Sequence, residues 1–184
     1  MSRNIIILNG SPRLRGNTAM LCDAFAKGAE SAGHAVTRFD LQKMDIRGCL
    51  GCMKGGKDPA SPCVQKDDMT KIYPAYMRAD LVALASPMYY WSVSAQLKTA
   101  FDRLFAVAEL DPNYANPRKE CVLLMAAEGD TPDNWKPVLD HYRALTGFLN
   151  WTDRGQALAG GVLEAGTVSG RPVLEEAFRL GASL

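Results

Sequence analysis

Short apolar runs alternate with longer amphipathic segments along this chain. Asn4–Leu8 (NIIIL) is a β-branched run followed by Asn-Gly, so we expect a buried first strand. Apolar residues then recur at helical spacing from Asn17 to Ala32, and Gly33 ends the predicted helix. The pattern continues, with strands predicted at 35–41, 80–86, 121–127 and 156–163, and helices at 68–78, 94–109, 132–149 and 171–180.

Repeated strand–helix alternation is typical of a parallel sheet with helices on both faces. We therefore predict an α/β protein with a doubly wound, five-stranded parallel sheet. Such sheets bind ligands beyond the carboxyl ends of their strands, where the strand order reverses. The loops to inspect are therefore 10–18, 86–94 and 127–132.

The bulk composition narrows the function classes. The chain has 184 residues, 47% hydrophobic and 22% charged, with a net charge of +1, which predicts one domain over residues 1–184 with a cysteine-containing loop insertion at 41–66. A nearly neutral chain has no electrostatic footprint for nucleic acid, and no apolar run suits a membrane span or a signal peptide. We expect a cytoplasmic protein with reduced cysteines and no nucleic-acid or membrane partner.

The loop after the first strand reads NGSPRLRGNT. Its spacing matches neither a P-loop nor the GxGxxG fingerprint. Ser11, Asn17 and Thr18 can donate hydrogen bonds to a phosphate, Arg13 can add charge, and the start of the following helix favours an anion. The alternative is an ordinary turn whose hydroxyl groups only cap the helix.

The loop after the third strand reads SPMYYWSVS. Pro87 keeps the chain extended, and Met88, Tyr89, Tyr90 and Trp91 offer a flat, mostly apolar surface. That surface suits a planar heteroaromatic ring, whereas the alternative is packing under the next helix or at a subunit interface. Together with the phosphate loop, it describes a site for a mononucleotide with a large ring system.

These loops, with GCLGC, KDDM and EEAFRLG, resemble the flavodoxin-like family of NAD(P)H-dependent FMN reductases, and especially its iron–sulfur flavoprotein branch. The resemblance implies a flavodoxin-like fold and FMN bound without a covalent bond. By analogy, the phosphate would be held by Ser11, Arg13, Asn17 and Thr18, the ring would be flanked by Pro87, Met88, Tyr89, Tyr90 and Trp91, and the far edge of the ring or the ribityl chain would be touched by Glu128, Gly129 and Asp130.

The resemblance also implies the chemistry. NAD(P)H would be the co-substrate, and electrons would pass through FMN to a small acceptor such as a quinone, a nitro compound or free flavin. No catalytic side chain is assigned, because the cofactor carries the reaction. Alternatives are a non-enzymatic FMN electron carrier serving a protein partner, or a module that has lost its cofactor. Exposed apolar surface on the aromatic loop predicts a homodimer or homotetramer.

Three of the five cysteines, Cys49, Cys52 and Cys63, lie in the segment GCLGCMKGGKDPASPC. The iron–sulfur branch holds a four-iron cluster with CxxCxxC and one more cysteine, but Gly55 occupies the third position here. We therefore assign no metal site. We rank three roles for this segment. The first is a cluster-free loop that shapes a substrate pocket or a subunit contact, the second is a redox or disulfide role, and the third is metal binding.

Overall fold

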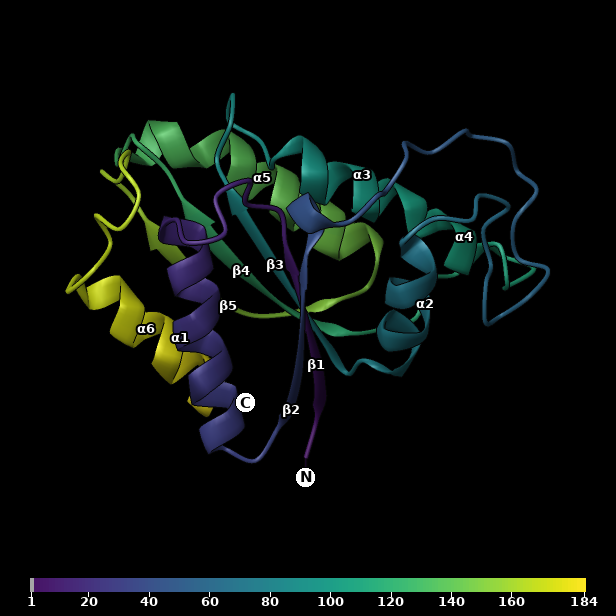
Figure 1. Ribbon diagram of the computed structural model, residues 1–184, viewed down its shortest axis with the longest axis horizontal. Coiled ribbons are helices and arrows are strands. Elements are labelled where there is room, and N and C mark those ends of the chain that lie inside the picture. The colour runs from purple at the N-terminus through teal and green to yellow at the C-terminus, as the bar shows by residue number, and fades with distance from the viewer. Residues whose placement is uncertain (1) are drawn as a thin grey trace.

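The computed structural model describes residues 2–184, which form a five-stranded parallel sheet of order β2-β1-β3-β4-β5 (Figure 1). The strands are β1 (Asn4–Asn9), β2 (Ala35–Asp40), β3 (Leu81–Pro87), β4 (Glu120–Ala126) and β5 (Thr152–Ala159). The helices are α1 (Asn17–Ser31), α2 (Met69–Arg78), α3 (Ala95–Arg103), α4 (Phe105–Ala108), α5 (Pro132–Phe148) and α6 (Pro172–Ala182), with a short 3-10 turn, η1 (Leu41–Lys43). The predicted doubly wound, flavodoxin-like sheet is confirmed.

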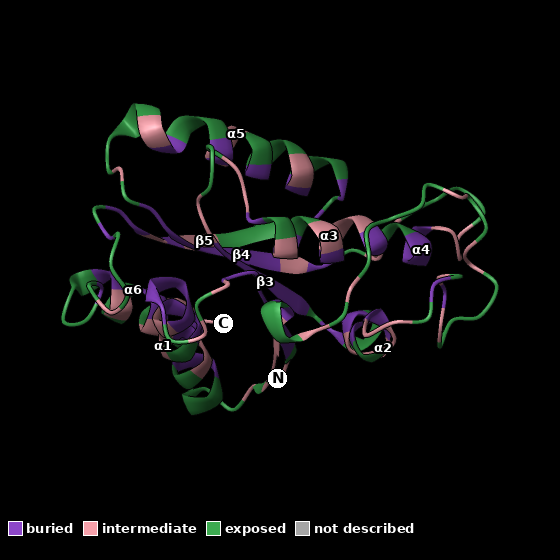
Figure 2. Ribbon diagram, turned by 45° about the horizontal axis from the view of Figure 1, so that its top comes forward, coloured by how far each residue is buried: buried purple, intermediate pink, exposed green. Residues whose placement is uncertain are grey.

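Helices cover both faces of the sheet. Side chains alternate across β1, so Ile5 and Ile7 pack with α1 and α6, whereas Ile6 and Leu8 pack with α2, α3 and α5. Figure 2 shows the buried sides of the helices turned toward the sheet. Double coverage explains why the central strands read as continuous apolar runs. Among residues 2–184, no helix combines the length and apolarity that crossing a membrane requires.

The helices α1 and α6 touch through their backbones. A Cβ atom built on Gly28 of α1 would collide with the carbonyl oxygen of Phe178, and one built on Gly181 of α6 would collide with the carbonyl oxygen of Phe25. Two glycines thus allow a separation that larger residues would prevent. As a result, α6 fixes the position of α1 on the sheet.

The predicted boundaries were wrong in two places that bear on the site. The strand β5 begins at Thr152 rather than at residue 156, because its polar first half lies at the sheet edge and a bulge opposite Cys121 and Leu123 accommodates Gly155 at a φ of 133°. Residues 160–163, predicted as strand, are therefore a loop. The predicted helix 94–109 is also divided, at Leu104, into α3 and α4.

Candidate functional site

A cleft lies at the carboxyl ends of β1, β3 and β4, where the strand order reverses. Its open volume is about 170 Å³. The three loops singled out from the sequence all reach it, contributing Ser11, Arg13, Gly16, Asn17 and Thr18 from the first, Pro87, Met88 and Tyr89 from the second, and Glu128 from the third. The parallel sheet therefore brings together side chains that are more than a hundred positions apart.

The helix α1 starts at this cleft without a side-chain cap. Its N-cap is Gly16, whereas Ser94 caps α3 and Thr131 caps α5 through their side-chain oxygens. The first-turn residues Asn17 and Thr18 are buried, yet the N–H groups of Asn17, Thr18 and Ala19 have no partner within residues 2–184. A buried helix start with free N–H groups is a site for an anion.

Two hydroxyl groups stand beside these N–H groups. Ser11 is buried and its hydroxyl donates to the carbonyl of Arg13 at 3.1 Å, while the hydroxyl of Thr18 has no partner in the described part of the chain. Asn9, which sequence reasoning missed, positions Ser11, because its Oδ1 accepts the Ser11 N–H at 3.1 Å and its Nδ2 donates to Asp40 at 2.8 Å. Its position at the end of a buried strand was the available signal.

Asn17 and Arg13 hold a second loop against the first. The side chain of Asn17 donates to the carbonyl of Glu164 at 2.9 Å and accepts the N–H of Val168 at 3.2 Å. Arg13 donates to the carbonyl of Leu163 at 2.9 Å. The Asn17 amide group, predicted to bind phosphate, is thus engaged with the loop after β5, and that loop adds Val162 and Leu163 to the cleft wall.

The aromatic loop ends in a tight hairpin turn. Tyr89 N–H donates to the Ser92 carbonyl at 2.9 Å, and Ser92 N–H donates to the Tyr89 carbonyl at 3.0 Å. Between them, Tyr90 and Trp91 have φ values of 47° and 58°, a region that such residues rarely adopt. Pro87, Met88 and Tyr89 line the cleft, whereas Tyr90 is 95% exposed at the tip and Trp91 is 56% exposed.

The third loop is divided between the cleft and α5. Glu128 lines the cleft. Gly129 instead accepts a hydrogen bond from Asn134 at 3.1 Å, and Asp130 accepts one from Trp135 Nε1 at 3.1 Å. Gly129 and Asp130 therefore anchor the loop to the start of α5. Of the three residues predicted to contact FMN, only Glu128 is among those that line the cleft.

Cys49, Cys52 and Cys63 line a separate cavity of about 30 Å³ beside α4, which shares no lining residue with the cleft. Residues 2–184 contain no group of three or more His, Cys, Asp or Glu arranged to hold a metal ion. A Cβ atom on Gly55 would collide with the carboxylate of Glu109 and approach the carbonyl oxygen of Pro62 at 2.9 Å. The donors present therefore do not fit a four-cysteine cluster.

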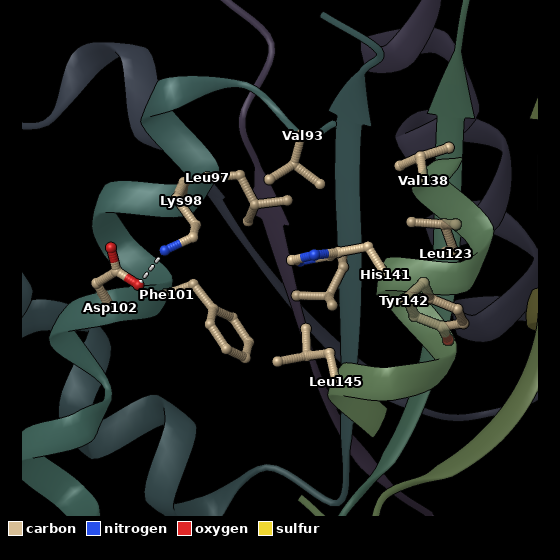
Figure 3. A pocket seen from close by; sticks show the side chains of 11 residues that line it. Val93, Leu97, Lys98, Phe101, Asp102, Leu123, Val138, His141, Tyr142 and Leu145 are labelled. Atoms are coloured by element: carbon tan, nitrogen blue, oxygen red, sulfur yellow. Dashed lines mark hydrogen bonds and ion pairs between the residues drawn. The ribbon is translucent and has the colours of Figure 1, made fainter. Parts of the chain in front are cut away.

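An apolar hollow lies between α3 and α5, on the face of the sheet opposite α1 (Figure 3). It measures about 230 Å³ and is walled by Leu97, Phe101 and Leu145 among others. His141 points across it from α5, and the Lys98–Asp102 ion pair, 2.6 Å long, lies at its α3 side. Val93, which follows the aromatic turn, also lines it, so this hollow begins where that turn ends.

The sequence model described as NADPH-dependent FMN reductase matches residues 3–159 of this chain. The chain belongs to that family. Membership confirms the resemblance drawn from the sequence and, with it, FMN as cofactor and NAD(P)H as co-substrate of an oxidoreductase family.

Curated relatives of this chain include iron–sulfur flavoproteins and an FMN-dependent quinone oxidoreductase. An iron–sulfur flavoprotein of Archaeoglobus fulgidus is 40% identical over 95 residues, which are 52% of this chain and 42% of that protein. The chain thus spans about half the length of the curated iron–sulfur flavoproteins that it matches. An FMN-dependent NADH:quinone oxidoreductase of Yersinia pestis is 24% identical over 179 residues, 88% of each chain.

Solved structures share the fold over nearly the whole chain. An NAD(P)H:quinone oxidoreductase from Methanothermobacter marburgensis superposes with a TM-score of 0.76 at 22% identity, covering 100% of this chain and 96% of that one. An FMN-dependent NADH-azoreductase from Bacillus anthracis, solved in complex with FMN, gives a TM-score of 0.68 at 14% identity, covering 97% and 96%. At these identities the likeness establishes the fold.

The residues of the cleft fit FMN. Free N–H groups of a buried helix start, flanked by the hydroxyls of Ser11 and Thr18, are the donor set that a phosphate monoester needs. The wall formed by Pro87, Met88 and Leu163 is apolar, as the face of a flavin ring requires. The N–H groups of Met88 and Tyr89 are bonded within the protein, whereas those of Tyr90 and Trp91 have no backbone partner among residues 2–184.

Proposed function

We propose that the protein is a cytoplasmic, FMN-dependent NAD(P)H oxidoreductase that reduces a small acceptor such as a quinone, a nitro compound or free flavin. The observation that carries the proposal is the buried, uncapped start of α1 facing an apolar wall across one cleft. Bound FMN would supply the transfer of electrons from nicotinamide to acceptor.

The side chains would bind, orient and shield. Ser11 and Thr18, with the first N–H groups of α1, would hold the phosphate, and Asn9 would keep Ser11 in place. Pro87 and Met88 would exclude water from one face of the ring. None of these groups needs to gain or lose a proton in this role.

Anaerobic reduction tests the proposal. The protein is loaded with FMN, freed of excess cofactor and mixed with NADPH and, separately, with NADH. We expect the visible flavin absorbance to bleach with at least one nicotinamide, faster than in a mixture of free FMN and the same nicotinamide. If flavin binds but stays oxidised with both NADPH and NADH, the proposed enzymatic function is rejected. That result would favour the alternative, an FMN electron carrier that serves a protein partner.

We further propose that a second copy completes the site, in a homodimer or homotetramer. The cleft is smaller than the roughly 300–1,000 Å³ of typical ligand pockets, so part of a flavin ring would stand outside it. The exposed Tyr90 and Trp91, and the largely apolar hollow between α3 and α5 that Val93 also lines, offer apolar surface that a second copy would cover. Sedimentation velocity should give a dimer or tetramer, and a monomer at working concentration would count against the proposal.

Replacing Tyr90 by Asn and Trp91 by Gly should separate stability from activity. Asn-Gly suits two successive positive φ values, so the free energy of unfolding should rise by about 1–2 kcal/mol. Turnover of a quinone should fall about tenfold, because the aromatic surface beside the ring is lost. Chemical unfolding and steady-state kinetics measure both, with Tyr90→Phe as the control that keeps the ring. Unchanged turnover would show that the aromatic tip has no part in the reaction.

A further inference from the structure

The five cysteines fall into two environments. Cys22 and Cys121 are fully buried, and burial raises the pKa of Cys22 to about 12 and that of Cys121 to about 11, so both are held as unreactive thiols. Cys49 is exposed, and Cys52 and Cys63 are half-buried, all three lining the same cavity. The flavin cleft uses none of these three thiols.

One buried arginine holds the two ends of the cysteine loop together. Arg103 and Asp67 both have fully buried side chains, and the guanidinium donates to the two carboxylate oxygens at 2.6 and 3.1 Å. The same guanidinium donates to the carbonyl of Arg47 at 2.7 Å. The loop between residues 47 and 67 is therefore anchored at its base, while most residues from 48 to 61 face solvent.

The Nε–H group of this arginine is unpaired within the described residues. Arg103 Nε is buried, and within residues 2–184 it has no hydrogen-bond partner, although Arg103 lines the cysteine cavity. Buried donors are normally satisfied, so this one indicates a place for an acceptor. The cavity offers the sulfur atoms of its three cysteines as that acceptor.

The CxxC segment turns both of its cysteines into this cavity. Gly51 has a φ of 59°, which a residue with a side chain rarely adopts, and this turn lies between Cys49 and Cys52. The N–H of Gly51 donates to Cys49 Sγ at 3.4 Å. The first cysteine is exposed to solvent and the second is half-buried.

We propose that Cys49 and Cys52 form a dithiol–disulfide pair that exchanges electrons with low-molecular-weight disulfides. The Cys49 thiolate attacks one sulfur of the external disulfide, forming a mixed disulfide and releasing one thiolate. The Cys52 thiolate then attacks Cys49 Sγ, closing the internal disulfide and releasing the second thiolate. Two electrons pass from the protein to the external disulfide, and the two thiol protons of the protein pass to solvent and to the leaving thiolates.

Peptide mapping tests the pair without flavin or nicotinamide, so the result is independent of the proposed function. The full-length protein is reduced with dithiothreitol, incubated with oxidised glutathione, alkylated and digested with trypsin. Residues 48–54 form one tryptic peptide that contains Cys49 and Cys52, whereas Cys63 lies in the peptide 58–66. We expect the 48–54 peptide to become two hydrogen atoms lighter and to escape alkylation.

Three variants assign the steps. Cys52→Ser should trap glutathione on Cys49, Cys49→Ser should lose the internal disulfide, and Cys63→Ser should retain it, as the matched control from the same cavity. A cross-link between peptides 48–54 and 58–66 would overturn the assignment of the pair. So would complete alkylation of Cys49 and Cys52 in wild-type protein after excess oxidised glutathione, a result that needs no variant to fold.

Discussion

Replacing Arg103 by methionine should lower the free energy of unfolding by about 3–5 kcal/mol, because the buried Asp67 carboxylate would lose its close partner and keep only the exposed Arg47 guanidinium, 3.8 Å away. Both side chains are 0% exposed and therefore have no contact with solvent water. The two hydrogen bonds between them take the place of hydration. The backbone N–H groups of Arg47 and Met69 also donate to Asp67, but they carry no full charge. Urea unfolding at neutral pH measures the loss.

An exposed ion pair provides the matched control. Lys98 and Asp102 lie 2.6 Å apart with side chains 51% and 43% exposed. Lys98→Met should therefore change the free energy of unfolding by less than about 1 kcal/mol. A similar small change in Arg103→Met would contradict the argument that burial makes the Arg103–Asp67 pair important.

The ion pair between Arg103 and Asp67 should also make the stability of the protein depend on pH. Burial by itself would raise the pKa of Asp67, but hydrogen bonds from Arg103, Arg47 and Met69 outweigh it and lower that pKa below its usual value. A carboxyl group with a lowered folded-state pKa contributes stability above its unfolded pKa and loses it as the pH falls through the folded pKa. Unfolding free energy should therefore decline in acid, and less steeply in Asp67→Asn.

Thr18→Asp should weaken FMN binding at least ~100-fold relative to Thr18→Asn, since a like charge beside the phosphate costs several kcal/mol. The two substitutions match in size and differ in charge. Thr18 is 2% exposed and lines the cleft in the first turn of α1, so either side chain would sit where the phosphate is expected.

The same substitution should stabilise the protein without cofactor. A carboxylate in the first turn of a helix is favourable by about 0.3–1 kcal/mol, because it meets the positive end of the helix dipole. Fluorescence titration with FMN and chemical unfolding of cofactor-free protein should thus move in opposite directions. Equal FMN affinity of the Asp and Asn variants would contradict the placement of the phosphate at the start of α1.

The fold could be predicted because its signal is local. A parallel sheet covered on both faces needs continuous apolar strands, and runs such as Asn4–Leu8 supply them in every central position. Parallel strands also align their carboxyl ends, which is why the sequence alone predicts that the loops at 10–18 and 86–94 lie together.

The rest of the site depends on contacts between residues far apart in the sequence, which the local pattern does not predict. Asn17 was expected to bind phosphate, but its amide group is bonded across 147 positions to Glu164. The sequence pattern predicts a strand over the cleft residues Val162 and Leu163, because the polar first half of β5 does not mark its beginning at Thr152. At a sheet edge, burial is too weak to mark a strand.

The close packing of Gly28 on α6 determines when, during synthesis, the flavin cleft can form. The start of α1 is synthesised before strands β2 to β5, yet its position is set by α6 and by the loop at 160–168, which leave the ribosome after all five strands. Domains gain their native contacts as units once the required segments are available. The nascent chain should therefore be unable to retain flavin until the residues of α6 have been released, however complete the sheet already is.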